Sequence, residues 1–169
     1  MTSENSENEI LVTGSKFLGV SGVKGTSSVV EKIMSENIDE LQILAYDITT
    51  NAVEFLDLLR SAIKGGVKTT MIYNTPKGDQ MKQKSRVDAI NELESLSSKY
   101  NNFIFVPFPV DGKILHAKVV IANRKKAYVG SSNFTWGGMS KNYEVGMVVG
   151  EDDSYTLSKL VDSLLPRVL

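Results

Sequence analysis

The chain has 169 residues, 41% of them hydrophobic, which fits one domain with a well-buried core and gives no sign of a second domain. It has no cysteine, which excludes metal sites built on thiolates, and no apolar run long enough to cross a bilayer. The net charge of −1 does not by itself indicate a nucleic-acid partner, and the acidic residues 1–9 do not form a secretion signal, so we expect a cytoplasmic protein.

The first half of the chain predicts strands that alternate with helices. We expect residues 1–15 to be a flexible segment and residues 16–169 to form a single domain. Asn51 is expected to cap a helix whose apolar positions recur on one face, as in a helix that packs against a core. In chain order, the predicted elements are an edge strand at 16–20, a helix at 26–37, a buried strand at 41–47, a helix at 51–64 and a strand that ends at Tyr73.

The second half predicts one more helix and then consecutive strands. The predicted elements are a helix at 79–100, strands at 102–106, 113–122, 125–130 and 143–149, and a closing helix at 154–165. Strands that alternate with helices, followed by a run of strands, favour an α/β fold in which a mixed β-sheet is flanked by helices on both faces.

His116 is the only histidine of the chain. A single histidine is more often a surface or core residue than a catalyst, so the residues around it must indicate whether it is catalytic. His116 and Lys118 lie in a predicted strand, where side chains alternate between faces, and so project from the same side, roughly 6 to 7 Å apart along the chain. Both can reach one phosphate group.

A polar segment, Gly130-Ser131-Ser132-Asn133, follows the next predicted strand. Short polar side chains beside a glycine let the backbone approach an anion closely and supply hydroxyl and amide donors. Alone, the segment could equally be a plain turn.

The spacing from His116 through Lys118, Gly130, Ser131 and Asn133 resembles the signature of the phospholipase D superfamily, His-x-Lys-x4-Asp-x6-Gly-Ser-x-Asn. One signature position differs, because Asn123 stands where the family has aspartate. The resemblance extends from about residue 17 onward, through the strand, helix and strand before the motif, and implies a phospholipase D-like fold. Since the acidic residue at this position is structural in the family, an asparagine that keeps its hydrogen-bonding oxygen could replace it.

The resemblance also implies roles for five side chains. His116 would attack phosphorus and form a phosphohistidine, while Lys118, Ser131 and Asn133 would hold the non-bridging oxygens. Glu144 would accept a hydrogen bond from an imidazole nitrogen. Because the family builds one site from two motifs and this chain has one, the resemblance implies a homodimer with the site on its two-fold axis. We expect no metal and no cofactor, since no closely spaced Asp/Glu cluster appears.

Local basic clusters suggest a nucleic-acid substrate in spite of the net charge. A solvated helix face is the alternative for the first cluster, and a core or dimer-interface position is the alternative for the tryptophan. The candidate contacts are Lys82, Lys84 and Arg86 in the first cluster, Arg124, Lys125 and Lys126 at the turn beside the motif, and Trp136 as a base-stacking residue.

Three functions remain open. The first is a nuclease acting on DNA or RNA, in restriction, defence or repair, for which an additional subunit could supply specificity. The second is a phospholipase or phosphatidyl transferase, although no amphipathic segment offers an acyl-binding surface. The third is a non-catalytic binding module that keeps the fold.

Overall fold

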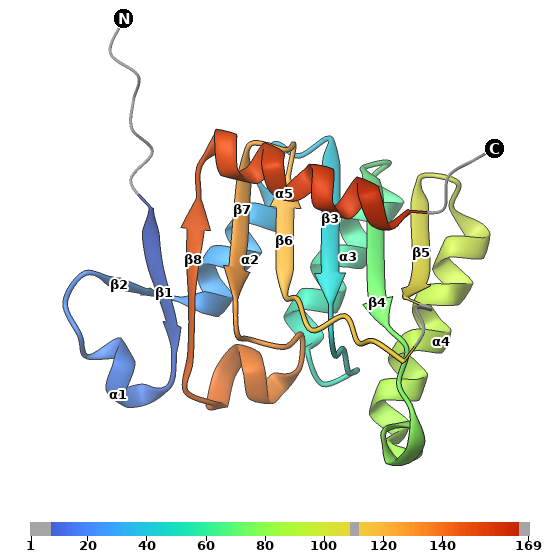
Figure 1. Ribbon diagram of the computed structural model, residues 1–169, viewed down its shortest axis with the longest axis horizontal. Helices are drawn as coiled ribbons and strands as arrows, with labels where there is room; N and C mark the ends of the chain where they lie inside the picture. The colour runs from blue at the N-terminus through green and yellow to red at the C-terminus, as the bar shows by residue number, and fades with distance from the viewer. Residues whose placement is uncertain (1–7, 109–111, 166–169) are drawn as a thin grey trace, which may run out of the picture.

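A single mixed sheet organises the chain (Figure 1). The computed structural model describes residues 8–108 and 112–165. The strand order is β2-β1-β8-β7-β6-β3-β4-β5. Neighbouring pairs are parallel for β3 with β4, β4 with β5 and β1 with β2, and antiparallel elsewhere. The strands are β1 (Glu9–Thr13), β2 (Val23–Gly25), β3 (Glu40–Ala45), β4 (Lys68–Asn74), β5 (Phe103–Phe108), β6 (Val119–Ala122), β7 (Lys126–Gly130) and β8 (Glu144–Val149).

Helices cover both faces of this sheet, as predicted (Figure 1). One face packs against α2 (Thr26–Ser35), α3 (Val53–Lys64) and α4 (Lys84–Lys99), and this layer contains the larger apolar core. The other face packs against α5 (Glu151–Leu164) through a smaller apolar cluster. Three short helical segments complete the described chain, namely α1 (Ser15–Leu18), η1 (Gly78–Lys82) and η2 (Gly137–Lys141).

The central strands are apolar on both sides because helices cover both sides. In β3, Ile43 is fully buried toward the larger core and Leu44 is nearly so toward the smaller one. The adjacent pair Met71 and Ile72 in β4 divides in the same way and is also fully buried. These strands therefore form a rigid base for the loops that follow them.

The strand directions bring several loops to one end of the sheet. Strands β3, β4, β5 and β7 end there, and β6 and β8 begin there, because β6 and β8 run antiparallel to their neighbours. We call this the site end of the sheet; it is the lower end in Figure 1.

The N-terminal predictions were wrong in two places. Residues Glu9–Thr13 are not flexible, because they form β1, which pairs with β2 and β8 and buries Leu11 completely. The edge strand predicted at 16–20 is the short helix α1. Pairing with distant strands decided the first outcome, whereas α1 is closed by a local hydrogen bond from the Leu18 amide to the Gly14 carbonyl at 3.1 Å. Residues 1–7 of the predicted flexible segment lie outside the described residues.

Several element boundaries also differ. Asn51 does not cap α3, whose N-cap is Ala52 with no side-chain hydrogen bond. The helix predicted at 79–100 is interrupted at Gln83, which separates η1 from α4. The strand predicted at 113–122 begins only at Val119, so the segment that carries His116 has no regular secondary structure and lies outside the sheet.

Candidate active site

The signature residues meet at the site end because β6, β7 and β8 are adjacent antiparallel strands. The amide N of Gly130 donates to the Lys118 carbonyl at 3.2 Å, and the amide N of Ser131 donates to the Val145 carbonyl at 3.0 Å. The segment before β6, the segment after β7 and the start of β8 are thereby held together. His116, Lys118, Ser131 and Glu144 come from these three places.

Lys118 contacts the histidine directly. Its Nζ lies 3.0 Å from the His116 Nδ1 and donates to the His116 carbonyl oxygen at 2.7 Å. The lysine is only 5% exposed, whereas the imidazole is exposed to solvent. Burial lowers the pKa of Lys118, and the charges of Glu144 and Asp47 oppose this effect. A desolvated cation beside an accessible imidazole suits the binding of an anionic substrate.

Glu144 is held by the polar segment after β7. The Ser131 hydroxyl donates to one carboxylate oxygen, and the Asn142 amide donates to the other at 3.3 Å. The amide N of Val145 donates to the Ser131 hydroxyl at 3.1 Å, which fixes the serine rotamer. Within the described protomer, Glu144 forms no hydrogen bond with His116, so that contact stays a prediction about the complete site.

Asn133 has a buried side-chain oxygen, Oδ1, without a hydrogen-bond partner in the described part of the chain. Buried polar atoms are usually paired, so this oxygen is an exception. An amide oxygen only accepts hydrogen bonds and cannot itself hold a phosphate oxygen, so the phosphate contact of Asn133 stays a prediction for its amide nitrogen. Gly138 lies against the Asn133 backbone, where an added Cβ would overlap the carbonyl oxygen and sit 2.7 Å from the amide nitrogen. The absence of a side chain at Gly138 therefore allows Asn133 its position.

Two glycines make room for a buried tyrosine beneath the polar segment. Gly130 and Gly146 are paired in register, and a Cβ on either would lie within 2.7 Å of the Tyr128 ring. The Tyr128 hydroxyl accepts a hydrogen bond from the Ser132 amide at 3.3 Å. Packing against Tyr128 therefore requires a glycine at the signature position Gly130.

The loop after β3 adds residues that the sequence analysis missed. The Phe134 amide donates to the Asp47 carbonyl at 3.1 Å, which ties this loop to the polar segment. The Tyr46 ring packs on the His116 imidazole with centroids 4.3 Å apart. Both Tyr46 and Asp47 directly follow a buried strand, and the carboxyl ends of such strands commonly carry functional groups. Their position directly after a buried strand is the sequence feature that could have identified Tyr46 and Asp47 as site residues.

Arg86 is not a surface cation, which corrects its assignment to the nucleic-acid contacts. It is 8% exposed and forms two hydrogen bonds of 2.6 Å with the Asp47 carboxylate. This bidentate pair raises the pKa of Arg86. Lys82 and Lys84 are exposed, at η1 and the start of α4, and pair with Asp79 and Asp88 on the surface.

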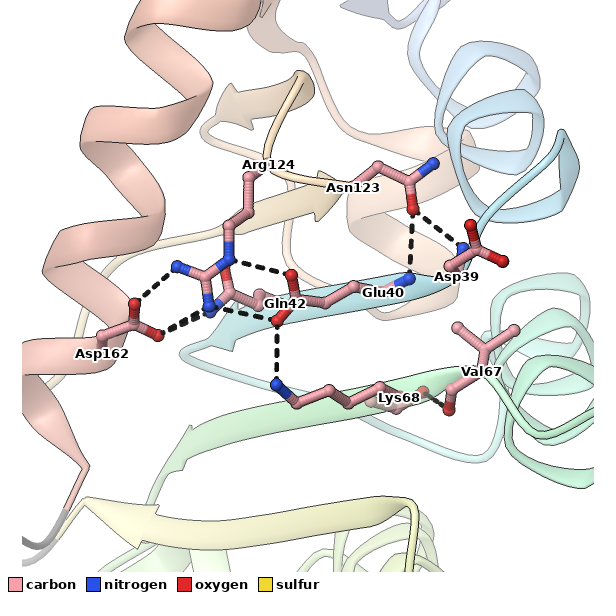
Figure 2. A network of polar contacts seen from close by, with 9 residues as sticks. Asp39, Glu40, Gln42, Val67, Lys68, Asn123, Arg124 and Asp162 are labelled. Atoms are coloured by element: carbon pink, nitrogen blue, oxygen red, sulfur yellow. Dashed lines mark hydrogen bonds and ion pairs between the residues drawn. The ribbon is translucent and has the colours of Figure 1, made fainter.

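The turn between β6 and β7 lies at the opposite end of the sheet from the site end (Figure 1), and Figure 2 shows the polar network around this turn. Asn123 Oδ1 accepts hydrogen bonds from the amides of Asp39 at 2.8 Å and Glu40 at 3.1 Å. Arg124 pairs with Glu40 at 2.8 Å and Asp162 at 2.6 Å, which raises its pKa. The expectation that this turn lies beside the motif was wrong, because an antiparallel hairpin separates its turn from its open end.

The remaining predicted nucleic-acid contacts are Lys125, Lys126 and Trp136, and they lie at different distances from the site. Lys125 and Lys126 are exposed at the same distant turn as Arg124, so none of the three shares a surface with His116 in one protomer. Trp136 is 53% exposed, and the Lys141 Nζ lies 5.6 Å from its ring centroid. Trp136 lies close to the polar segment in sequence and stays a candidate for stacking.

Within residues 8–108 and 112–165, no three His, Asp or Glu side chains are grouped to share a metal ion. Over the same residues, no helix combines the length and apolar character that a bilayer crossing requires.

Comparison with known proteins agrees with this arrangement. The family model described as "Cardiolipin synthase, PLD-like domain" matches residues 29–164. The structure of Nuc from Salmonella typhimurium, a phospholipase D family member, superposes with a TM-score of 0.69 at 19% identity and covers 93% of both chains. NucT from Helicobacter pylori gives a TM-score of 0.68 at 16% identity and covers 94% of both chains.

A curated relative is similar in sequence as well. The DISARM protein DrmC of Bacillus paralicheniformis is 21% identical over 144 residues, which are 85% of this chain and 57% of that protein. The chain therefore spans little more than half the length of this relative.

Proposed function

Because the chain belongs to the phospholipase D superfamily, we propose that it is a phosphodiesterase, and specifically a nuclease that hydrolyses DNA or RNA at a site shared by two copies of the chain. The observation that carries the proposal is the grouping of an exposed imidazole, a buried ammonium and the Ser131–Glu144 pair at one end of the sheet. These groups supply a nucleophile and a positively charged hydrogen-bond donor for a phosphate.

The reaction proceeds in two displacements. In the first, an imidazole nitrogen of His116 attacks phosphorus, the bond to the leaving oxygen breaks, and the imidazolium of a second copy's His116 protonates that oxygen. In the second, this now neutral imidazole takes a proton from water, the resulting hydroxide attacks phosphorus, and the phosphorus–nitrogen bond breaks. Atoms and protons balance without a metal ion.

Lys118 supports the charge that grows on the non-bridging oxygens. Its ammonium is almost wholly removed from water, and a charge in such surroundings acts on a bound phosphate more strongly than an exposed one. The nearby carboxylates of Glu144 and Asp47 favour its protonated state.

The need for two copies follows from the single histidine of the chain. Exposed apolar side chains flank the site, as dimer formation at this end of the sheet requires. Ile114 is 59% exposed and lies two residues before His116, while Tyr143 and Val145 are 52% and 51% exposed on either side of Glu144.

A nucleic-acid substrate is favoured by the exposed Lys82 and Lys84, by the exposed Trp136 and by the similarity over nearly the whole length of the small Nuc and NucT chains. The alternatives, a phospholipase or phosphatidyl transferase and a non-catalytic binding module, are outcomes of the same test.

The test compares the wild-type chain with His116→Ala on plasmid DNA, single-stranded DNA, RNA and phosphatidylcholine, all in excess EDTA. The proposal predicts nucleic-acid cleavage that persists in EDTA and is lost in the variant. Lipid turnover without nucleic-acid cleavage would establish the second function instead. If a folded dimer turned over none of these substrates, the non-catalytic binding module would be the remaining function.

A further inference from the structure

Tyr46 contacts both members of the His116–Lys118 pair. Its ring centroid lies 4.3 Å from that of the imidazole, at an interplanar angle of 53°, and the Lys118 Nζ lies 4.9 Å from the same ring centroid. Both contacts are of the kinds that stabilise a fixed geometry, an aromatic pair and a cation above an aromatic face.

The histidine needs such a partner because the sheet does not hold it. The segment before β6 has no strand pairing. Next to His116 in this segment, the Leu115 amide donates to the Asn74 side-chain oxygen at 3.0 Å. The imidazole is exposed and would otherwise sample several rotamers. The Tyr46 ring limits this freedom from one side, and Lys118 limits it from another.

The hydroxyl of Tyr46 is itself held by η1. The Gln80 side-chain amide donates to this hydroxyl at 3.1 Å, and the Gln80 side-chain oxygen accepts a hydrogen bond from the Lys77 amide at 3.2 Å. The Gln80 carbonyl accepts from Arg86, which is paired with Asp47, the residue after Tyr46. Two consecutive residues after β3 are thus tied to the same stretch of chain.

These contacts do not belong to the apolar core. Tyr46 is half-buried and belongs to neither apolar cluster of the described structure, and its ring meets two polar side chains. Packing alone therefore does not explain a tyrosine here.

We propose that Tyr46 is a positioning residue, which holds the His116 imidazole and the Lys118 ammonium in their relative places, and that Gln80 fixes the Tyr46 ring. The proposal rests on the proposed function only for its effect on turnover. The geometric claim concerns the free protein and can be tested without a substrate.

The geometric test uses NMR, because the single histidine gives one unambiguous set of ring-proton signals. The Tyr46 ring current displaces these signals in the wild type. Tyr46→Leu is expected to move them to positions typical of a free imidazole. Tyr46→Phe and Gln80→Ala both keep the ring and lose the hydrogen bond to the Tyr46 hydroxyl, so both are expected to reduce the displacement only in part. The matched control is Tyr155→Leu, an exposed tyrosine on α5. Signals unchanged in Tyr46→Leu would overturn the proposal.

The kinetic test measures kcat and KM on the substrate found for the wild type. Loss of positioning is expected to lower kcat about 10- to 100-fold in Tyr46→Leu with little change in KM, and Tyr46→Phe is expected to restore most of the rate. Equal kcat values in a folded Tyr46→Leu variant and the wild type would also overturn the proposal. If the wild type turns over no substrate, the proposed function fails and the NMR result still decides whether Tyr46 positions His116.

Discussion

Replacing Asn123 separates a structural role for the variant signature position from a catalytic one. Asn123 has a φ of 52°, in the left-handed region, and forms three hydrogen bonds through its side chain. The third bond is a donation from Nδ2 to the Asn37 carbonyl at 2.8 Å. Asn123 follows the four-residue strand β6 at the end of the sheet opposite the site end, so roughly 13 Å of strand separates it from the segment that carries His116. Contact with a phosphate at the site is therefore excluded within one protomer.

The size of the effect follows from these contacts. Each hydrogen bond contributes about 0.5–1.5 kcal/mol to the free energy of unfolding, toward the lower value here because water reaches the turn. The left-handed backbone costs alanine roughly 1 kcal/mol. Asn123→Ala is thus expected to lower the free energy of unfolding by about 2–4 kcal/mol and the Tm by about 5–12 °C. Asn123→Asp keeps both accepted bonds and should cost about 1 kcal/mol.

Urea unfolding and thermal melts give the stability, and turnover per folded molecule gives the catalytic effect. We expect kcat to be unchanged in both variants well below their Tm. Lys125→Ala is the matched control, because that side chain is exposed and reaches Glu151 only at 3.9 Å; its stability should stay within about 0.5 kcal/mol of the wild type. A large loss of kcat in Asn123→Ala with an unchanged Tm, or a gain of activity in Asn123→Asp, would refute the structural role.

Three further predictions concern other parts of the structure. Gly138→Ala is expected to destabilise the chain by about 1–3 kcal/mol and to abolish turnover, because the new Cβ meets the Asn133 backbone. Gly137→Ala is the control and is expected to do neither, because its added Cβ meets only a side-chain atom at 3.4 Å. Melting and activity assays compare the two variants. Arg124→Met removes the partner that lowers the pKa of Glu40 and of Asp162. The variant should therefore lose stability fully above pH 5, and the loss should shrink as the pH falls through the folded-state pKa values of these carboxylates. Urea unfolding between pH 7 and pH 2 measures this, and a stability difference that stays constant with pH would contradict it. Burial lowers the pKa of Lys118. The wild type should therefore gain stability relative to Lys118→Met as the pH rises from the folded-state pKa of this lysine toward its ordinary value of 10.5. A stability difference between the two proteins that does not change with pH would be evidence against this burial cost.

The sequence predicted the parts of the site that local spacing controls. The signature spacing identified Lys118, Ser131 and Glu144 as neighbours, and the short strands on either side of Asn123 were predicted as consecutive elements. A hairpin fixes its own register, so residues at its open end must meet once the turn is placed.

The parts that the sequence analysis missed depend on contacts between distant segments. Arg86 looked like one of several surface cations, and only its pairing with Asp47, 39 residues earlier, removes it from the surface. Tyr46 becomes part of the site through packing on a residue 70 positions later, which no local pattern indicates. Similarly, β1 is a short strand whose main partner, β8, lies at the other end of the chain.

The most direct test of the shared site mixes wild-type chains with His116→Ala chains, allows the copies to exchange, and measures turnover against the wild-type fraction. If each site needs an imidazole from both copies, turnover follows the square of that fraction, and an equal mixture retains about one quarter of the activity. A linear decrease, with about one half retained at the same mixture, would show that one chain acts alone and would contradict the account.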